Sequence, residues 1–261
     1  MDLELLMRTA VRAAYRSGDV LRERYGRLIS VGKKGPNDLV TDADLAAEAE
    51  IIATLRAACP EDAIVAEEIG SREGSGERRW LVDPLDGTVN YAHQVPFFAV
   101  SIACLQREEA QVGVVFNPLS GELFTARTGG GAQLNGQSIQ VGPETQVSES
   151  LLATGFPYDL SRGFEPLAAR FLRVLQASQG VRRLGSAALD LCYVACGRFA
   201  GYWERDLKPW DSAAGILIVR EAGGIVTDFA NRPADAQASE VLATNGRIHA
   251  DMLAMMEDGG G

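Results

Sequence analysis

The sequence predicts a mixed fold in two halves, an α+β half over residues 1–145 and an α/β half over residues 146–261. Up to about residue 145, two helical patterns precede a run of closely spaced strands, which is typical of an antiparallel sheet covered by helices. After Gly142-Pro143, strands alternate with helices, as in α/β proteins. The chain has 261 residues, 46% of them hydrophobic, which is enough for one large domain or two closely packed ones.

Two amphipathic helices are predicted at the start of the chain. The first covers residues 3–25, where apolar residues recur at near-helical spacing: Leu6, Ala10, Ala14, Leu21 and Tyr25. Thr41 and Asp44 have the spacing of a capping box, which starts the second helix. Pro60 ends this helix, whose expected buried stripe consists of Leu45, Ala49, Ile52, Leu55 and Cys59.

Strands are predicted for the rest of the N-terminal half. A polar, Gly-rich stretch over residues 70–76 is typical of a mobile loop between the first two of them. Asn135-Gly136 is a strong signal for a two-residue hairpin turn. The expected strands cover residues 63–66, 80–82, 97–105, 111–116 and 122–126.

The C-terminal half is predicted to alternate between the two kinds of element. Its strands are expected at 151–154, 181–184, 199–203, 225–228 and 241–244, and its helices at 165–178, 187–196, 213–222 and 248–256. Ser186 and Asp211 can be ordinary N-caps of two of these helices. Gly185-Ser186 also follows a strand directly, and a helix start offers free N–H groups and partial positive charge to phosphate or sugar oxygens.

The stretch Trp80 to Asn90, with sequence WLVDPLDGTVN, carries the strongest functional signal. The apolar strand is expected to stop after Val82, because Pro84 cannot donate a hydrogen bond and Gly87 permits a bent backbone. Asp83 and Asp86 can then converge, with the carbonyl of Leu85 between them. These oxygen donors suit hard cations such as magnesium. A surface turn is the alternative, because Asp-Pro and Asp-Gly are common turn dipeptides.

Several separated motifs, in this order along nearly the whole chain, resemble the inositol monophosphatase family. The central one is D-P-L-D-G-T at residues 83–88. The others are Asp38-Leu39-Val40-Thr41-Asp42-Ala43-Asp44, Ala66-Glu67-Glu68, Pro96 to Ile102, Gly185-Ser186-Ala187-Ala188, Trp210-Asp211-Ser212-Ala213-Ala214-Gly215 and Glu221-Ala222-Gly223-Gly224. One departure stands out, since many family members have Thr-Thr-Asn where this chain has Thr88-Val89-Asn90.

The resemblance implies a five-layer αβαβα sandwich, of the type shared with fructose bisphosphatase, with the active site between the two halves. It implies two or three Mg²⁺ ions held mostly by the N-terminal half, with these ligands: Glu67, Asp83, the Leu85 carbonyl, Asp86 and Asp211. Glu67 and Thr88 are assigned to orienting and activating a water, with Asp44 near the metals. Substrate-binding positions are Gly87 and Thr88 for the phosphate, and Gly185, Ser186, Ala187, Glu204 and Asp211 for the remainder of the site.

The expected reaction is hydrolysis of a phosphate monoester, with myo-inositol phosphate as the leading substrate. Phosphatases of the same fold acting on fructose 1,6-bisphosphate, histidinol phosphate or NADP are alternatives. A metal-stabilised interaction protein without turnover is an alternative from a different class. A homodimer and inhibition by lithium are expected from the resemblance alone.

Composition excludes some other classes. The net charge of −10 argues against nucleic-acid binding, which depends on basic residues. No apolar run approaches the ~20 residues of a membrane span, and Met1-Asp2-Leu3-Glu4 lacks the basic start of a secretory signal, so a cytoplasmic location is expected. The cysteines lie within apolar runs and are expected to be buried free thiols: Cys59, Cys104, Cys192 and Cys196.

Overall fold

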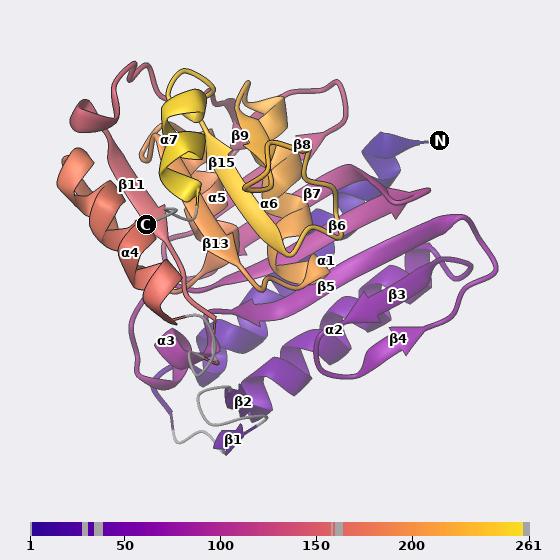
Figure 1. The fold of residues 1–261 in the computed structure, drawn as a ribbon. Coiled ribbons are helices and arrows are strands. Elements are labelled where there is room, and N and C mark those ends of the chain that lie inside the picture. Colours follow the sequence, from indigo (N-terminus) through magenta and orange to yellow (C-terminus); the bar gives the residue numbers. More distant parts are fainter. Residues whose placement is uncertain (1, 28–30, 34–38, 158, 160–163, 258–261) are drawn as a thin grey trace.

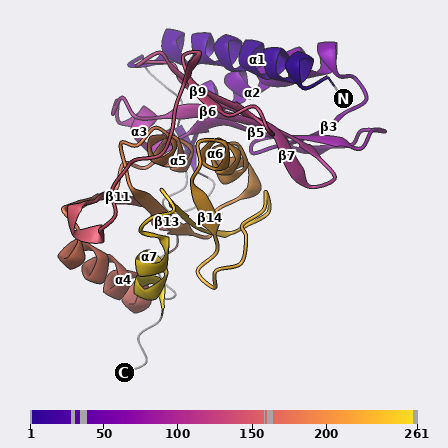
Figure 2. The same cartoon turned by 90° about the horizontal axis from the view of Figure 1, so that it is seen from above.

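The computed structural model describes residues 2–27, 31–33, 39–157, 159 and 164–257, which form five layers (Figures 1 and 2). Helices α1 (Leu3–Arg24) and α2 (Asp42–Ala58) cover one face of an eight-stranded sheet. Helices α5 (Ala187–Ala195) and α6 (Pro209–Glu221) lie between this sheet and a five-stranded one. Helices α4 (Phe164–Ala177) and α7 (His249–Met256) cover the outer face of the second sheet. The predicted αβαβα order is therefore confirmed.

The eight-stranded sheet is antiparallel except at one pair. Its strands in spatial order are β10 (Gln137–Ser138), β9 (Ala132–Leu134), β8 (Glu122–Arg127), β7 (Glu109–Asn117), β6 (Ala99–Gln106), β5 (Arg78–Asp86), β3 (Ala63–Ala66) and β4 (Gly70–Arg72). The pair β3–β5 is parallel, so a purely antiparallel sheet is a wrong expectation. The reason is that residues 70–72, expected in a mobile loop, form an edge strand on one side of β3, and the chain returns to pair on its other side.

The five-stranded sheet is mixed. Its order is β12 (Gly180–Arg182), β11 (Leu151–Thr154), β13 (Gly201–Arg205), β15 (Glu240–Thr244) and β14 (Ile225–Thr227), with β11 parallel to both neighbours and β15 antiparallel to both of its own. The remaining short elements are β1 (Val31–Lys33), β2 (Leu39–Thr41), α3 (Thr88–Ala92) and a 3₁₀ turn at Val147–Glu149. Within the described ranges, no helix is both long and apolar enough to cross a membrane.

Local signals predicted several of these elements correctly. Thr41 Oγ1 accepts hydrogen bonds from the backbone N–H groups of residues 43 and 44, and Asp44 Oδ2 accepts one from Thr41 N at 2.8 Å, which completes the capping box. Asn135 and Gly136 have φ values of 50° and 77°, as a two-residue hairpin turn between β9 and β10 requires. The four cysteines are free, and three of them are buried.

The predicted stripe on α2 is partly wrong. Leu45 is 51% exposed and Ala49 also faces outward. The buried face instead contains Ala47, Glu48 and Ile51, together with Ile52 and Leu55. The buried face is rotated about the helix axis relative to the predicted stripe, because α2 packs against both α1 and β5.

Close packing of α6 on β7 depends on Gly113. A Cβ at Gly113 would lie 2.8 Å from the carbonyl oxygen of Ala214 and 3.2 Å from its Cα. Both are backbone atoms, so the helix would have to move away from the sheet.

We expect Gly113→Ala to lower the unfolding free energy by about 1–3 kcal/mol, the usual cost of overpacking. In a chain of this size that corresponds to a fall in Tm of about 2–10 °C by thermal unfolding. Gln111→Ala, near the start of the same strand, is the control and should change stability by less than about 0.5 kcal/mol. A Gly113→Ala protein with unchanged Tm would show that the helix–strand contact is looser than described.

Candidate active site

Strand alternation directs two acidic residues toward the central helices. Successive side chains of a strand point to opposite faces of the sheet. On β5, Val82 packs on the α1/α2 side and Leu81 in the central core, so Asp83 follows Leu81 onto the central face. On β3, Val65 packs against the central core, and Glu67 follows it in the same way. Two neighbouring parallel strands therefore present carboxylates to the layer that contains α5 and α6.

A β-bulge brings a third carboxylate to the same face. Asp86 lies three positions after Asp83 and would face the opposite side of a regular strand. The register with β6 shifts here, because Asp83 pairs with Ser101 and Asp86 with Ala99, so β5 has one extra residue. The expectation that the strand stops after Val82 is thus wrong: β5 continues to Asp86, and the missing N–H of Pro84 falls within the bulge.

These residues line a cavity of about 760 Å³ between the two halves of the chain. Every predicted metal- or substrate-binding residue lines it: Glu67, Asp83, Leu85, Asp86, Gly87, Thr88, Gly185, Ser186, Ala187, Glu204 and Asp211. Asp44, the remaining predicted site residue, does not line the cavity and is fully buried behind Thr88.

Thr88 connects the cavity to the buried Asp44. Gly87, with φ 97°, ends β5 and leads into the short helix α3, which the sequence analysis did not predict. The Thr88 hydroxyl lies 3.1 Å from Asp44 Oδ1 and 3.0 Å from the carbonyl oxygen of Leu85, and it can donate to either. Asp44 therefore both caps α2 and accepts a hydrogen bond from the cavity wall.

Asp86 joins the two halves of the chain. Its Oδ2 accepts hydrogen bonds from Ser186 Oγ at 2.5 Å and from the backbone N–H of Ala188 at 2.8 Å, both at the start of α5. Ser186 is also the N-cap of this helix, accepting from Leu189 N at 3.4 Å. Nearby, the Asn90 amide donates to the carbonyl of Leu184 at 2.7 Å. The turn after β5 is thus tied directly to the segment that begins α5.

Asp211 is not the N-cap that the sequence suggested. Helix α6 begins at Pro209, where proline is favoured because its missing N–H needs no partner, and not at residue 213. Asp211 is therefore the third residue of the helix and not its N-cap. Its Oδ2 accepts a hydrogen bond from the backbone N–H of Lys208 at 2.8 Å.

Burial and mutual repulsion raise the pKa values of the carboxyls in the cavity. Asp83 is 2% exposed, and burial, with the charges of Glu67, Asp86 and Asp211, holds its pKa well above the usual range. Burial also raises the pKa of Asp211 strongly. The pKa of Asp86 rises to about 6 through burial, although the hydrogen bonds from Ser186 and Ala188 oppose this. The pKa of Glu204 rises to about 7, again mainly through burial.

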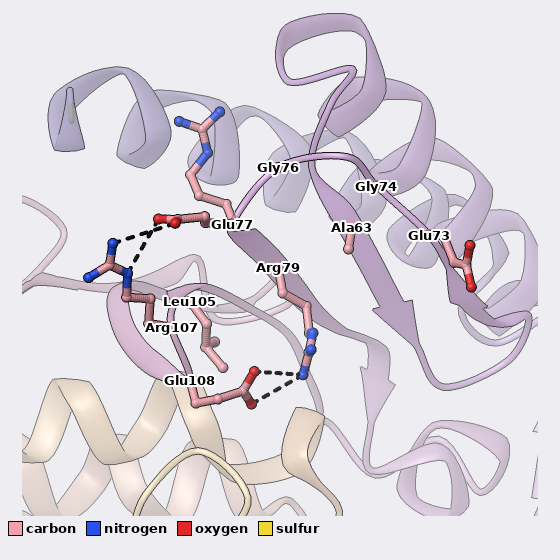
Figure 3. A pocket seen from close by; sticks show the side chains of 10 residues that line it. Ala63, Glu73, Gly74, Gly76, Glu77, Arg79, Leu105, Arg107 and Glu108 are labelled. Carbon is pink, nitrogen blue, oxygen red and sulfur yellow. Dashed lines mark hydrogen bonds and ion pairs between the residues drawn. The ribbon is translucent and has the colours of Figure 1, made fainter.

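A second pocket shows how acidic residues are neutralised elsewhere on the protein. This pocket, of about 250 Å³, lies beside the end of β5 remote from the bulge (Figure 3). There, Arg107 pairs with Glu77 at 3.3 Å and Arg79 with Glu108 at 3.1 Å. In the main cavity, by contrast, Asp83, Asp86 and Asp211 form no ion pair with any Lys or Arg of the described ranges.

The chemistry of the cavity suits a hard cation. Its candidate ligands are carboxylate and carbonyl oxygens, and three of its carboxylates, those of Asp83, Asp86 and Asp211, form no ion pair with a basic side chain of the described ranges. Among the residues that the structure describes, no group of three or more His, Cys, Asp or Glu side chains is arranged so that it could hold a metal ion. The inference that this cavity suits magnesium therefore rests on its oxygen donors and on the negative charge of Asp83, Asp86 and Asp211, which no ion pair of the described ranges balances.

Several residues that shape the site were not predicted from the sequence. Glu48 of α2 is fully buried, and its carboxylate accepts the N–H groups of Glu68 and Ile69, both at 2.9 Å, which supports the turn after Glu67. Glu48 lies on the buried face of α2, and an acidic residue at such a position is the sequence signal that could have identified its role. Arg183, Gly155 and Lys208 also line the cavity, and no motif marks them.

Comparisons with known proteins agree with this geometry. Residues 2–258 match the model of the inositol monophosphatase family. An inositol-1-monophosphatase of Synechocystis sp. is 45% identical over 253 residues, covering 96% of this chain and 88% of that protein. A Nus factor SuhB of Haemophilus influenzae is 43% identical and covers 95% of this chain and 94% of its own length. The crystal structure of extragenic suppressor protein suhB from Bartonella henselae superposes with a TM-score of 0.94 at 39% identity, covering 97% and 99% of the two chains.

Proposed function

The chain belongs to the inositol monophosphatase family, and from this premise we propose that it hydrolyses phosphate monoesters of polyols with the help of magnesium. The leading substrate is myo-inositol phosphate, which would give myo-inositol and phosphate. The observation that carries the proposal is the single cavity in which unneutralised aspartates from the N-terminal half face Glu204 and the start of α5 from the C-terminal half. One end of such a cavity suits cations and a phosphate, and the other suits hydroxyl groups.

The residues that would hold two or three magnesium ions are Glu67, Asp83, Asp86, Asp211 and the carbonyl of Leu85. Magnesium, when bound, supplies Lewis acidity toward phosphoryl and water oxygens. It would also supply the local positive charge that an acidic protein needs to bind an anionic ester.

Thr88 and Glu67 would orient the attacking water. A hydroxyl has one donor hydrogen and two acceptor lone pairs. When Thr88 donates to Asp44 at 3.1 Å, its lone pairs remain available to accept a hydrogen bond from water in the cavity. Glu67 lines the same cavity and would be a second hydrogen-bond acceptor for that water, placed to take one of its protons. Val89 in place of the common threonine leaves this hydroxyl intact.

Residues on both sides of the cavity would bind the substrate. The N–H groups of Gly87 and Thr88 would hold phosphate oxygens, since bent backbone can present donors to an anion. Glu204 would accept hydrogen bonds from neighbouring hydroxyls, because an ionised carboxylate is an acceptor only. Gly185, Ser186 and Ala187 would contact the polyol beside it, and Asp211 would bind the substrate as well as a metal.

The test is phosphate release from a panel of esters in the presence of Mg²⁺. We expect myo-inositol 1-phosphate to give a higher kcat/KM than fructose 1,6-bisphosphate, histidinol phosphate or NADP. Asp83→Asn protein, purified in parallel, controls for contaminating phosphatases. The proposed reaction class is wrong if no ester in the panel releases phosphate above this control.

A second candidate function is an interaction role, which relatives named Nus factor SuhB favour. It would not require turnover. Partner capture that is equal for the wild type and the Asp83→Asn protein, with no phosphatase activity in either, would support this role over the enzyme. A cytoplasmic location, a homodimer and inhibition by lithium complete the proposal as family expectations.

A further inference from the structure

The carboxylate of Glu204 rests directly against Gly155. Strands β11 and β13 pair in parallel with Thr154 opposite Trp203, so Gly155 and Glu204 follow the last pair of this register. A Cβ at Gly155 would overlap the Glu204 carboxylate, its two oxygens included. Gly155 does not have a positive φ, so its backbone conformation does not require glycine. The space that Glu204 occupies is what excludes a side chain here.

Tyr202 holds the same carboxylate through a hydrogen bond. It lies two residues before Glu204, on the same face of β13, and its ring is fully buried in the central core. Its hydroxyl donates a hydrogen bond to Glu204 Oε2. The strands themselves are joined beside this point by Thr154 Oγ1, which donates to the carbonyl of Trp203 at 2.8 Å.

Together these contacts restrict the rotamers that the Glu204 side chain can adopt. A glutamate normally loses substantial rotamer freedom when it binds a ligand, and a carboxylate that is already fixed avoids this cost. Glu204 lines the cavity while Tyr202 lies behind it, so the carboxylate presents remaining lone pairs to the cavity in one position. A fixed acceptor selects strongly for substrates with a hydroxyl at the matching place.

We propose that Gly155 and Tyr202 are positioning residues that fix Glu204, and that they thereby make the site selective for hydroxyl-rich phosphate esters over esters without neighbouring hydroxyls. The proposal rests on the proposed phosphatase function. Neither residue needs to touch the phosphate or the metals. Their loss should therefore raise KM for a polyol phosphate much more than it lowers turnover of a simple ester.

The experiment compares kcat/KM for myo-inositol 1-phosphate and for p-nitrophenyl phosphate, which has no neighbouring hydroxyl, in each variant of the full chain with Mg²⁺. Tyr202→Phe and Gly155→Ala should lower the ratio of the two values about tenfold or more, mainly through KM for the inositol ester. Tyr193→Phe is the matched control, because the Tyr193 hydroxyl also bonds a glutamate, Glu122 at 3.3 Å, but lies away from the cavity. It should leave the ratio unchanged.

A double variant tests the contact itself. Glu204→Asp shortens the acidic side chain by one methylene, which leaves room for the methyl group of Gly155→Ala. The double variant should therefore lose less selectivity than the two single effects added together. If Gly155→Ala does not fold, Tyr202→Phe decides the outcome alone.

The possible outcomes distinguish failure of the positioning role from failure of the phosphatase function. An active wild type whose ratio is unchanged in folded Tyr202→Phe protein overturns the positioning role and leaves the phosphatase function standing. Equal losses for both substrates overturn it as well, because that result indicates general damage. A wild type that hydrolyses neither ester overturns the phosphatase function, and the positioning role with it.

Discussion

Replacing Asp83 with asparagine is expected to lower kcat/KM for the polyol ester by on the order of 10³-fold or more, without unfolding the protein. Metal ions supply several kcal/mol of transition-state stabilisation, and about 1.4 kcal/mol corresponds to a tenfold change in rate. An asparagine keeps the oxygen that accepts the Leu85 N–H at 2.9 Å, so the local turn is preserved. Asp211→Asn should have a similar effect, because the asparagine oxygen can still accept from Lys208 N.

Stability measurements distinguish a lost ligand from a damaged fold. In metal-free buffer the Asp83→Asn protein should be at least as stable as the wild type, since the substitution removes a buried charge repelled by Glu67, Asp86 and Asp211. Added Mg²⁺ should stabilise it less than the wild type. Asp251→Asn, on the exposed face of α7, is the surface control and should keep full activity. A near wild-type rate in Asp83→Asn protein would mean that the ligand assignment is wrong.

Removing magnesium by exhaustive dialysis against EDTA is expected to abolish turnover, and adding it back should restore activity and raise Tm. Saturating ligand at about 100 times its Kd adds about 2.7 kcal/mol, which corresponds to a Tm increase on the order of 5–10 °C for a chain of this size. Differential scanning fluorimetry with and without Mg²⁺ measures this. Ca²⁺ at equal concentration tests whether the site prefers the smaller ion.

The stabilisation by magnesium should grow with pH. The pKa of Asp86 is raised from 3.8 to about 6, and those of Asp83 and Asp211 are also raised. Between the unfolded and folded pKa values the folded protein holds more protons, so the metal-free protein loses stability as pH rises through this window. Magnesium binds the deprotonated carboxylates and opposes that loss. The Tm increase caused by Mg²⁺ should therefore be larger at pH 8 than at pH 5.5, and equal increases would contradict a carboxylate site.

Local patterns in the sequence determined most of the elements and their order. The capping box at Thr41 and Asp44 and the Asn135-Gly136 hairpin formed as predicted, because each depends on neighbouring residues and on backbone preferences that act within a few positions. The motifs also contain every predicted residue that lines the cavity except Glu204. They predicted which residues would lie together and on which segments, and the structure places those residues around one cavity.

Only the tertiary structure decided how those residues meet. The bulge that turns Asp86 to the face of Asp83 depends on the register of β5 with β6, and the close contact of Glu204 with Gly155 depends on the register between β11 and β13. The support that Glu48 gives to the turn after Glu67 depends on where α2 packs against the sheet. Such features arise from contacts between segments far apart in the chain, and hydrophobic spacing within one segment carries no information about its register with another.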